Sequence, residues 1–284
     1  MKLGAHVSTA GGLPTAIDRA EAMEAETIQI FATSPRAWAF RPGSEEQVAA
    51  FRERSRETGI GPTFIHGSYL VNVGGASELL EKSIKSLTSH MNFAGELGAA
   101  GVIFHGGSHK GAGFDAVLDQ AAGALKEVLA NSPENVWLII ENSAGMGAQV
   151  GSSFQEIGRM MEAIDSPQVM VCLDTEHCFA AGYEITDAES IDSVVDEFDR
   201  EIGLGRLVAV HANDSKVECG AGVDRHENIG DGYMGLDGFR VIMAHQAFGD
   251  VPFLLEVPGI DNSGPDKENL DRLKQIRLDL GLTS

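Results

Sequence analysis

The sequence is short of basic residues, cysteine and long apolar runs, and each shortage excludes a class of protein. Its 284 residues include 21 Lys and Arg against 42 Asp and Glu, so the formal net charge is -21. Phosphate backbones attract basic surfaces, and this charge therefore excludes a protein that coats nucleic acid without specificity. No apolar run reaches the roughly 18 residues that a membrane helix needs, and we expect no membrane segment. The start, MKLGAHVSTAGG, also lacks the apolar stretch of a signal peptide.

Only three cysteines are present, Cys172, Cys178 and Cys219, and they form neither a CxxC pair nor a disulfide framework. We therefore expect free thiols in a protein of the reducing cytoplasm. The acidic residues are spread along the chain and 43% of all residues are hydrophobic, which excludes an acidic disordered tail and allows a substantial core. The charge bias suits a surface adapted to high salt or an ordinary acidic protein, and the sequence leaves both open.

Short apolar runs alternate with longer helical patterns along the whole chain. The apolar runs predict strands buried on both faces at 2–8, 27–33, 61–67, 101–107, 135–143, 169–175, 207–213 and 252–258. Helical patterns lie at 13–25, 44–58, 78–99, 115–130, 153–164, 188–203, 236–247 and 266–280. Ser44 and Ser77 precede acidic residues and predict helix N-caps, whereas Gly59 and Gly98 predict helix ends.

Eight strand–helix units predict the α/β class, and within it a (β/α)₈ TIM barrel that forms one domain over residues 1–284. A doubly wound sheet is the alternative architecture. The segment 212–235 is too long for a simple connection, and long loops tend to carry function.

Polar residues of the metal-binding type stand at or just past the C-terminal end of strand after strand. They are His66, His105, Glu141, Asp174, His177, His211 and Glu256. In a parallel barrel these strand ends meet on one face, where active sites are built. Like charges so close together would repel each other, and divalent cations remove that repulsion. Imidazole with carboxylate favours zinc, or manganese where carboxylates dominate.

The long loop after the seventh predicted strand adds Asp224 and His226 to this set. An Asp-x-His pair in an extended segment points both side chains to the same side. Together with His177 the pair offers a third metal position, so nine candidate ligands are enough for three ions. Two ions about 3.5–4 Å apart can activate a hydroxide and stabilise an in-line phosphoryl displacement.

The other histidines and one tryptophan receive separate predictions. His90 and His245 lie in helical patterns, and we expect them at the surface. His6, at the end of the first strand, and His109, after a glycine-rich turn, are within reach of the barrel mouth, and their roles stay open. Trp38 lies on the loop after the second strand, and we expect an aromatic ring at this position to contact a ligand.

Eight motifs follow one another along the chain. They are GAHVSTAGG (4–12), HGSYLVN (66–72), FHGGSH (104–109), ENSAGMG (141–147), LDTEHCFAAGY (173–183), HANDSK (211–216), VDRHENIGDGYMG (223–235) and LLEVP (254–258). In this order they resemble the motifs of the endonuclease IV family of apurinic/apyrimidinic endonucleases. The resemblance runs from residue 4 to about 258, and the fifth and seventh motifs are the specific ones.

The resemblance implies a TIM barrel with a trinuclear zinc cluster that cleaves double-stranded DNA 5′ to an abasic site. Such an enzyme would leave a 3′-hydroxyl and would also trim blocked 3′ ends. The first ion would be held by His66 and His105, with Glu141 bridging to the second and positioning the hydroxide nucleophile between the ions. The second ion would be completed by Asp174, His211 and Glu256, and the third would be held by His177, Asp224 and His226. Zinc lowers the pKa of bound water towards neutrality, so hydroxide is available.

Two further residues take roles only through the resemblance. Arg36 and Tyr69 match the positions that enter the DNA at the lesion, where a wedge and a stacking ring stabilise an extruded abasic nucleotide. Without the resemblance, Arg36 would be a solvated charge and Tyr69 a loop-packing residue. The family also implies DNA with abasic sites or 3′-blocked ends as the partner, and we expect a monomer.

Three positions depart from the family pattern. Gly67 follows His66, where an acidic residue or alanine is expected, and Gly106 follows His105 in place of proline, which puts loop rigidity in doubt. Cys178 replaces a small residue, and its thiolate would compete for zinc unless it points away.

Two rival functions are open to this sequence. A sugar isomerase or epimerase of the xylose isomerase-like barrel class uses one metal ion, for which Glu141, Asp174, His211 and Glu256 would suffice. The five other candidate ligands would then have no role, which favours the nuclease. The second rival is a noncatalytic binder of damaged DNA with a structural metal site.

The predicted ions also change the local charge. Three divalent ions add six positive charges against four ligand carboxylates, so phosphate would be drawn to the mouth of an acidic protein. We expect the affinity for DNA to fall less steeply with salt than that of a basic DNA binder.

Overall fold

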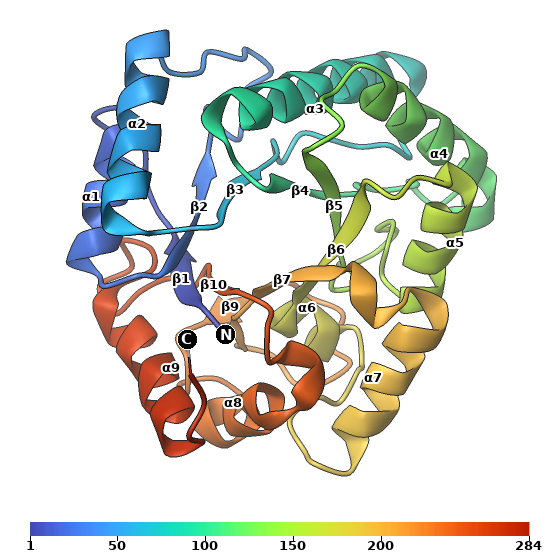
Figure 1. Cartoon of the computed structure of the whole chain (residues 1–284). Coiled ribbons are helices and arrows are strands. Elements are labelled where there is room, and N and C mark those ends of the chain that lie inside the picture. Colours follow the sequence, from blue (N-terminus) through green and yellow to red (C-terminus); the bar gives the residue numbers. More distant parts are fainter. Residues whose placement is uncertain (284) are drawn as a thin grey trace.

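The computed structural model describes residues 1–283, in which eight parallel strands form a closed barrel (Figure 1). The strands follow one another around the barrel in the order β1-β10-β7-β6-β5-β4-β3-β2. Their bounds are β1 (Leu3–His6), β2 (Thr27–Phe31), β3 (Thr63–His66), β4 (Gly101–His105), β5 (Trp137–Glu141), β6 (Val169–Asp174), β7 (Leu207–His211) and β10 (Phe253–Leu255). The predicted TIM barrel is confirmed, and the doubly wound sheet is excluded because β1 pairs with both β10 and β2.

Helices surround the barrel as an outer ring (Figure 1). They are α1 (Pro14–Ala22), α2 (Glu45–Thr58), α3 (Ser77–Leu97), α4 (Phe114–Ala130), α5 (Phe154–Ile164), α7 (Ser190–Glu201), α8 (Gly235–Ala244) and α9 (Lys267–Asp279). Ser44 caps α2, and Gly59 and Gly98 end α2 and α3 in the left-handed region, as predicted. The N-cap prediction for Ser77 is wrong. The helix begins one residue earlier than expected, so Ser77 is its first residue and Ala76 holds the cap position without a side-chain bond.

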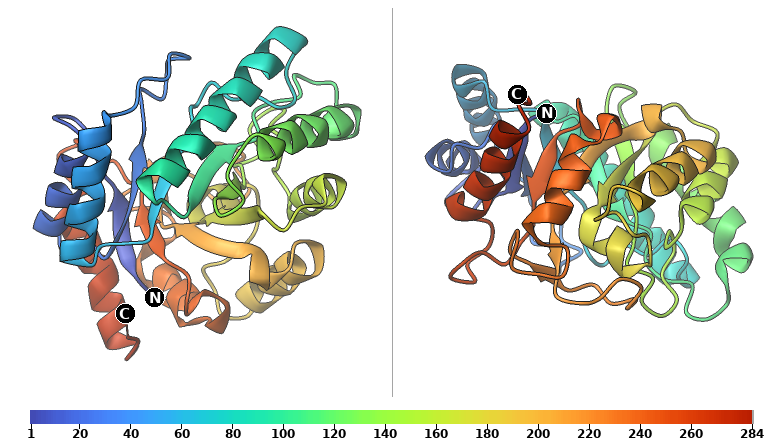
Figure 2. Two further views of the ribbon diagram at one scale, coloured as in Figure 1. Left: turned by 45° about the horizontal axis from the view of Figure 1, so that its top comes forward. Right: turned by 90° about the horizontal axis from the view of Figure 1, so that it is seen from below.

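The loops at the C-terminal ends of β6 and β7 contain short elements that the sequence did not predict. The helix α6 (Thr175–Ala180) follows β6 directly, and β8 (Asp214–Ser215) pairs with β9 (His226–Glu227) in the long loop after β7. Two short 3₁₀ helices, η1 (Leu204–Arg206) and η2 (Gln246–Phe248), lie before β7 and after α8. The terminal amino group of Met1 donates to the carbonyl of Thr283, and both lie at the end of the barrel away from the long loop (Figure 2). No helix within residues 1–283 is long and apolar enough to cross a membrane.

The interior of the barrel is apolar up to a defined level and polar above it. Side chains alternate between the two faces of a strand, so every second residue points into the barrel. The buried residues Phe64, Ile103, Ile139, Cys172, Ala209 and Leu254 form the interior cluster. Two residues further along the same strands stand His66, His105, Glu141, Asp174, His211 and Glu256. Strand alternation therefore places a polar layer directly above the apolar one.

Candidate metal centre

Glu141 lies at the centre of the polar layer and has an exposed fraction of 0%. Its Oε2 is 3.3 Å from Nε2 of His66 and 3.5 Å from Nε2 of His105. Its other oxygen, Oε1, is 2.9 Å from Nδ1 of His211. One carboxylate therefore contacts imidazoles from three different strands, with an oxygen on each side.

A second group of side chains surrounds His211. Its Nδ1 is 3.4 Å from Oε2 of Glu256 and 3.8 Å from Oδ2 of Asp174. Asp174 and His211 are neighbours in the register of β6 and β7, which brings the two side chains to the same height in the barrel. The group contains three carboxylates, counting Glu141, and one imidazole.

The third group joins α6 to the long loop after β7. Asp174 is the N-cap of α6, and its Oδ1 accepts the backbone N–H of His177 at 3.0 Å. This cap fixes His177 within the first turn, and its Nε2 lies 3.3 Å from Oδ2 of Asp224. Asp224 also approaches Nε2 of His226 at 3.5 Å, and that nitrogen is 3.7 Å from Oδ2 of Asp174. The structure thus brings together all nine predicted ligand residues.

Four of these imidazoles are held in one orientation by a hydrogen bond from their other nitrogen. Nδ1 of His66 donates to the carbonyl of Gly67 at 2.8 Å, and Nδ1 of His177 donates to the carbonyl of Asn142 at 2.9 Å. Nε2 of His211 donates to Oε1 of Gln29 at 2.8 Å. In His226, Nδ1 donates to the carbonyl of Glu256 at 3.4 Å. Such bonds orient each ring so that its opposite nitrogen faces the site, where in His211 that nitrogen is 2.9 Å from Oε1 of Glu141.

The donor atoms that face this space fit a metal centre. Among the described residues, the buried atoms His66 Nε2, Glu141 Oε2 and His226 Nε2 have no hydrogen-bond partner. Buried polar atoms are costly when unpaired, and a bound cation would satisfy them. Candidate ligand atoms lie within 4.8 Å of one another in three groups. The groups are His66, His105 and Glu141; Glu141, Asp174, His211 and Glu256; and Asp174, Glu176, His177 and His226. Nitrogen and carboxylate oxygen donors of this kind suit zinc or manganese.

The charges in the site also indicate a place for cations. Burial would raise the pKa of Glu141, but His105 and His211 hold that pKa well below its usual value. Burial would lower the pKa of His177, but Asp174 and the other facing carboxylates raise it well above its usual value. The pKa of Asp224 falls to about 2, against the effect of burial, because of its contact with His177. Positive charge therefore stabilises the carboxylates of Glu141 and Asp224, and divalent ions would take the place of the protons on the facing imidazoles.

Two buried residues at the site were missed by the sequence analysis. Gln29 bonds to His211, as described, and its Nε2 donates to Oε1 of Glu256 at 2.5 Å. Glu176 has an exposed fraction of 0%, and its Oε2 is without a partner among the described residues. Burial and the charge of Asp174 raise the pKa of Glu176 to about 7. The only signal for Gln29 was a polar residue inside an apolar run, and for Glu176 a carboxylate between two predicted ligands.

The remaining histidines have structural contacts. His6 reaches the mouth, where its Nδ1 lies 3.2 Å from Oε1 of Glu256. His109 accepts the backbone N–H groups of Gly111 and Gly113, so it orders its own loop.

The surface prediction for His90 is wrong. His90 is buried on α3, where it contacts the edge of the Phe40 ring and bonds to the carbonyl of Ser86. His245 lies at the surface after α8, as predicted, but is half-buried. Its Nε2 is 3.2 Å from Oδ1 of the exposed Asp192, and its Nδ1 accepts the N–H of Ala247.

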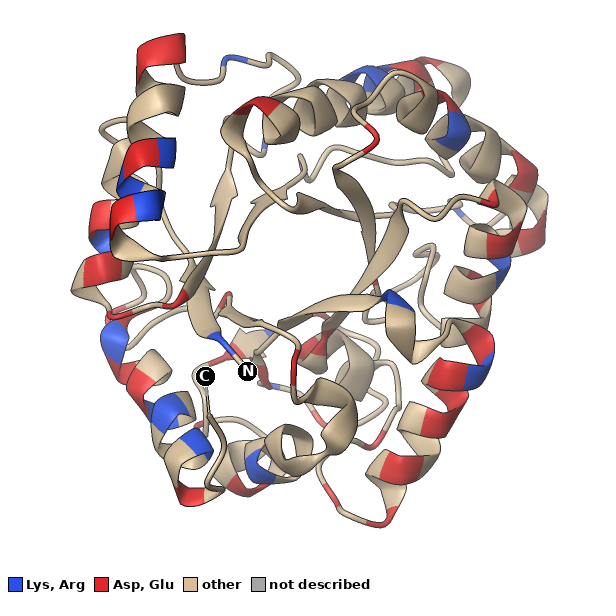
Figure 3. Cartoon of the chain, in the orientation of Figure 1, with Lys and Arg blue, Asp and Glu red and all other residues tan. Residues whose placement is uncertain are grey.

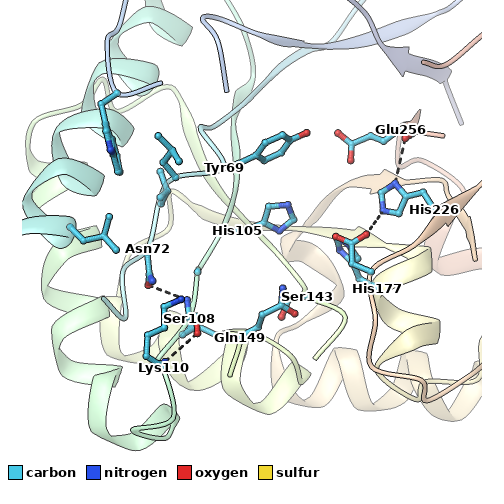
Figure 4. A pocket seen from close by; sticks show the side chains of 17 residues that line it. Tyr69, Asn72, His105, Ser108, Lys110, Ser143, Gln149, His177, His226 and Glu256 are labelled. Atoms are coloured by element: carbon cyan, nitrogen blue, oxygen red, sulfur yellow. Dashed lines mark hydrogen bonds and ion pairs between the residues drawn. The ribbon is translucent and has the colours of Figure 1, made fainter. Parts of the chain in front are cut away.

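A cavity of about 790 Å³ opens above the polar layer (Figure 4). One side is lined by His105, His177, Asp224, His226 and Glu256, and the other by Trp38, Tyr69, Asn72, Ser108 and Lys110 among others. Tyr69 is 49% exposed, and its ring points across the cavity towards Glu256 (Figure 4). Trp38 lies in the lining, and its contact with a ligand stays a prediction, whereas Arg36 is exposed on the same loop.

The departures from the family pattern have local explanations. Cys178 packs in the apolar core outside the site, and burial raises the pKa of its thiol well above the usual value. A Cβ on Gly67 would lie 3.3 Å from Cβ of Phe104 and 3.4 Å from the carbonyl of Ile103, so a side chain would be tight there. A Cβ on Gly106 would meet Val150 at 3.1 Å. The glycines thus allow the loops to pack closely beside the ligands.

Comparison with known proteins gives matches over nearly the whole chain. A family described as "Xylose isomerase-like TIM barrel" matches residues 17–276. A protein of Natronomonas pharaonis named probable endonuclease 4 is 40% identical over 277 residues, which cover 97% of this chain and 98% of that protein. The crystal structure of endonuclease IV from Thermus thermophilus matches with a TM-score of 0.87 and 36% identity, covering 98% of this chain and 100% of that one. A D-tagatose 3-epimerase-like protein shares only the fold, with a TM-score of 0.76 at 17% identity over 99% of this chain and 98% of that one.

Proposed function

Because this chain belongs to the endonuclease IV family, and is therefore an enzyme of the nuclease class, we propose that it repairs DNA by incision at abasic sites. It hydrolyses the phosphodiester bond 5′ to the abasic site in double-stranded DNA, leaves a 3′-hydroxyl, and trims blocked 3′ ends. The proposal includes three Zn²⁺ ions per chain, with Mn²⁺ as an alternative at one or more positions. The proposal also includes a monomeric enzyme that works in the cytoplasm. The three free cysteines support a reducing compartment.

The observation that carries the proposal is the surplus of candidate ligands. The group of Glu141, Asp174, His211 and Glu256 would be enough for a one-metal isomerase. Five further residues converge on the same mouth, namely His66, His105, His177, Asp224 and His226. An isomerase has no use for them, whereas a phosphodiesterase that works with several ions needs them all.

Each ion has a set of residues that would hold it. His66 and His105 would bind the first ion, Asp174, His211 and Glu256 the second, and His177, Asp224 and His226 the third. When bound, such ions supply water of lowered pKa and neutralise charge on the phosphate in an in-line displacement. Glu141 offers one oxygen to each of the first two groups, so its role is to hold their spacing.

Asp174 holds the spacing on the other side of the second group. Its Oδ2 lies 3.8 Å from Nδ1 of His211 and 3.7 Å from Nε2 of His226. Its Oδ1 is already occupied by the N–H of His177. The orientation of this carboxylate is therefore set by the start of α6, and it connects the second and third groups.

The charge pattern of the mouth supports a polyanionic substrate. Of the 42 acidic residues, none lies in the loops after β1 to β5, which are residues 7–13, 32–44, 67–76, 106–113 and 142–153. The same loops carry Arg36, Arg41 and Lys110, while most acidic residues lie on the outer helices (Figure 3). A DNA backbone can approach this side of the mouth without meeting a carboxylate. The shallow salt dependence expected from the sequence stays a prediction.

The loops after β2 and β3 are hydrogen-bonded to each other at the place where we expect the DNA to be distorted. The N–H of Tyr69 and the hydroxyl of Ser68 both donate to the carbonyl of Pro35, at 3.0 and 2.8 Å. Arg36 follows Pro35, so Arg36 and Tyr69 are held beside each other. We assign Arg36 to insertion into the base stack of the DNA helix and Tyr69 to contact with the lesion. A nucleotide without a base is easily extruded, and the ring of Tyr69 can stack on the base beside it.

Incision of a defined duplex tests the proposal. A labelled duplex with one abasic site should be cut on the 5′ side and leave an end that a polymerase extends, while an undamaged duplex stays intact. EDTA should abolish the cut, and metal analysis should give three ions per chain. One ion per chain together with aldose–ketose interconversion would support the isomerase instead. Binding of the abasic duplex without incision, with metal present, would support the noncatalytic binder.

A further inference from the structure

Glu176 is a buried carboxylate that lies beside the candidate ligands and that the proposed metal centre does not use as a ligand. We propose that Glu176 is a positioning residue, which fixes the segment carrying Asp224 and His226 against α6 and so assembles the third ligand group. This inference rests on the metal centre of the proposed function. It assigns a role to a side chain that lies between the candidate ligands Asp174 and His177 in the sequence.

The contacts of one oxygen carry the argument. Oε1 of Glu176 accepts the backbone N–H of Arg225 at 3.0 Å and the hydroxyl of Ser215 at 3.2 Å. Arg225 is the residue between Asp224 and His226. Ser215 lies on β8 directly opposite His226 on β9. A single oxygen of α6 therefore binds both sides of the β8–β9 hairpin at the position where the ligands stand.

The hairpin has other anchors, which hold β8 and the ring of His226. On β8, Asp214 accepts the backbone N–H groups of Gly230, Gly232, Met234 and Gly235, and Nδ1 of His226 donates to the carbonyl of Glu256 at 3.4 Å. Each strand of the hairpin is two residues long, and a short two-stranded hairpin is marginally stable by itself. The bonds from Gly220 to Phe179 and from Gly222 to Ala180 attach the far part of the loop to α6. The side chain of Asp224 is 42% exposed, so packing does not fix it. Within residues 1–283, the contact from Glu176 is the one that reaches the backbone between Asp224 and His226 from α6. Buried supports of this kind set ligand geometry.

Two substitutions separate this role from direct metal binding. E176Q keeps an oxygen acceptor at the same reach and loses the charge, whereas E176D keeps the charge and is one methylene too short for Arg225. If Glu176 acts by position, E176Q should behave like the wild type and E176D should lose metal. If Glu176 acts as a ligand through its second oxygen, E176Q should lose more metal than E176D. E218A is the matched control, because Glu218 is an exposed acid in the same loop.

Metal retention is the readout, and it needs no DNA. Each protein is loaded with Zn²⁺, dialysed against graded chelator, and analysed for zinc per chain and for melting temperature. We expect E176D to release one ion at about 10- to 100-fold lower chelator than the wild type. E176Q and E218A should stay within about threefold. Retention by E176D equal to that of the wild type, or loss in E176Q equal to or greater than loss in E176D, overturns the inference. A wild type that retains its zinc but fails to cut an abasic duplex would overturn the proposed substrate and leave this result intact.

Discussion

At the base of the barrel Glu26 uses both carboxylate oxygens in hydrogen bonds, whereas at the mouth Glu141 has one oxygen without a partner among the described residues. Arg277 donates to Oε1 and Oε2 of Glu26 at 2.7 Å each, and the amide of Leu3 donates to Oε2 at 2.9 Å. Burial would raise the pKa of Glu26, but Arg277 and Leu3 bring it below its usual value. This pair connects α9 to the start of the barrel.

The two ends therefore use charge for different purposes. In TIM barrels the ends of the strands carry the chemistry and the opposite face contributes stability. A fully paired carboxylate such as Glu26 stabilises the folded chain. The unpaired metal-ligand atoms at the mouth do not stabilise the fold, and they become favourable only when a ligand binds. Substitutions at the mouth should change activity with little effect on unfolding, and those at the base should do the reverse.

The largest effect is expected at the centre of the mouth. E141Q removes the charge that contacts two ligand groups, and we expect incision of the abasic duplex to fall by at least about a thousandfold. Single-turnover incision measures the change, and E81Q on the exposed face of α3 is the control. The melting temperature of metal-free E141Q should stay within a few degrees of the metal-free wild type. Incision at a tenth of the wild-type rate would show that Glu141 does not hold the centre together.

The next effect concerns the rim of the mouth. Y69A removes a ring that reaches across the cavity, and stacking is worth about 1–3 kcal/mol, so binding of the abasic duplex should weaken by roughly 5- to 150-fold. Y69F keeps the ring and should stay within about twofold. Equilibrium binding with a labelled duplex in EDTA measures both without incision. Equal weakening in Y69A and Y69F would assign the effect to the hydroxyl and contradict the stacking role.

A smaller effect is expected at the base. R277A leaves Glu26 partly buried without its main partner, and we expect the free energy of unfolding to fall by about 1–2 kcal/mol. Urea denaturation measures this loss, while the rate of incision should not change. R240A is the control, since Arg240 pairs with Asp279 at an exposed site and should cost under about 1 kcal/mol. A loss of incision in folded R277A would break the separation between the two ends.

The smallest effect is a dependence of stability on pH. The pKa of Glu26 is lowered from 4.5 in the folded chain, so its stabilising contribution is present above the unfolded pKa and is lost as pH falls through the folded pKa. The difference in unfolding free energy between the wild type and E26Q should therefore be constant near neutral pH and shrink below about pH 4.5. Urea denaturation at several pH values measures it. A difference in unfolding free energy that grows as pH falls would contradict a lowered pKa of Glu26 in the folded chain.

The barrel and the nine converging residues are predictable from the sequence for the same reason. Strands buried on both faces give continuous apolar runs, and parallel strand ends meet at one face. His66 or Glu141 can therefore be placed at the mouth without any coordinates. Asp224 and His226 are two residues apart, so an extended backbone places both side chains on the same side. They reach His177 when the long loop after β7 folds back over the barrel.

Gln29, Glu176 and His90 could not be predicted, because their surroundings come from distant parts of the chain. The inward direction of Gln29 depends on the register of β2 against β1, where it pairs with His6. The helix α6 is six residues long, too short to show a helical period, and the contacts of Glu176 are made with residues 39 and 49 positions further on. His90 is covered by Phe40 from another loop, which no helical pattern in α3 reveals.

The offset of two residues between apolar cluster and polar layer has a consequence for how such a barrel can change. The reactive groups form a layer one side chain deep, and the six residues beneath them already close the barrel without help from the chemistry. Replacement of the upper layer leaves the lower one packed, so reaction and architecture can vary independently. A single-residue insertion within a strand would instead turn its ligand outward and its apolar partner with it. Evolution of this scaffold is therefore permissive towards substitution at the strand ends and strict about strand length.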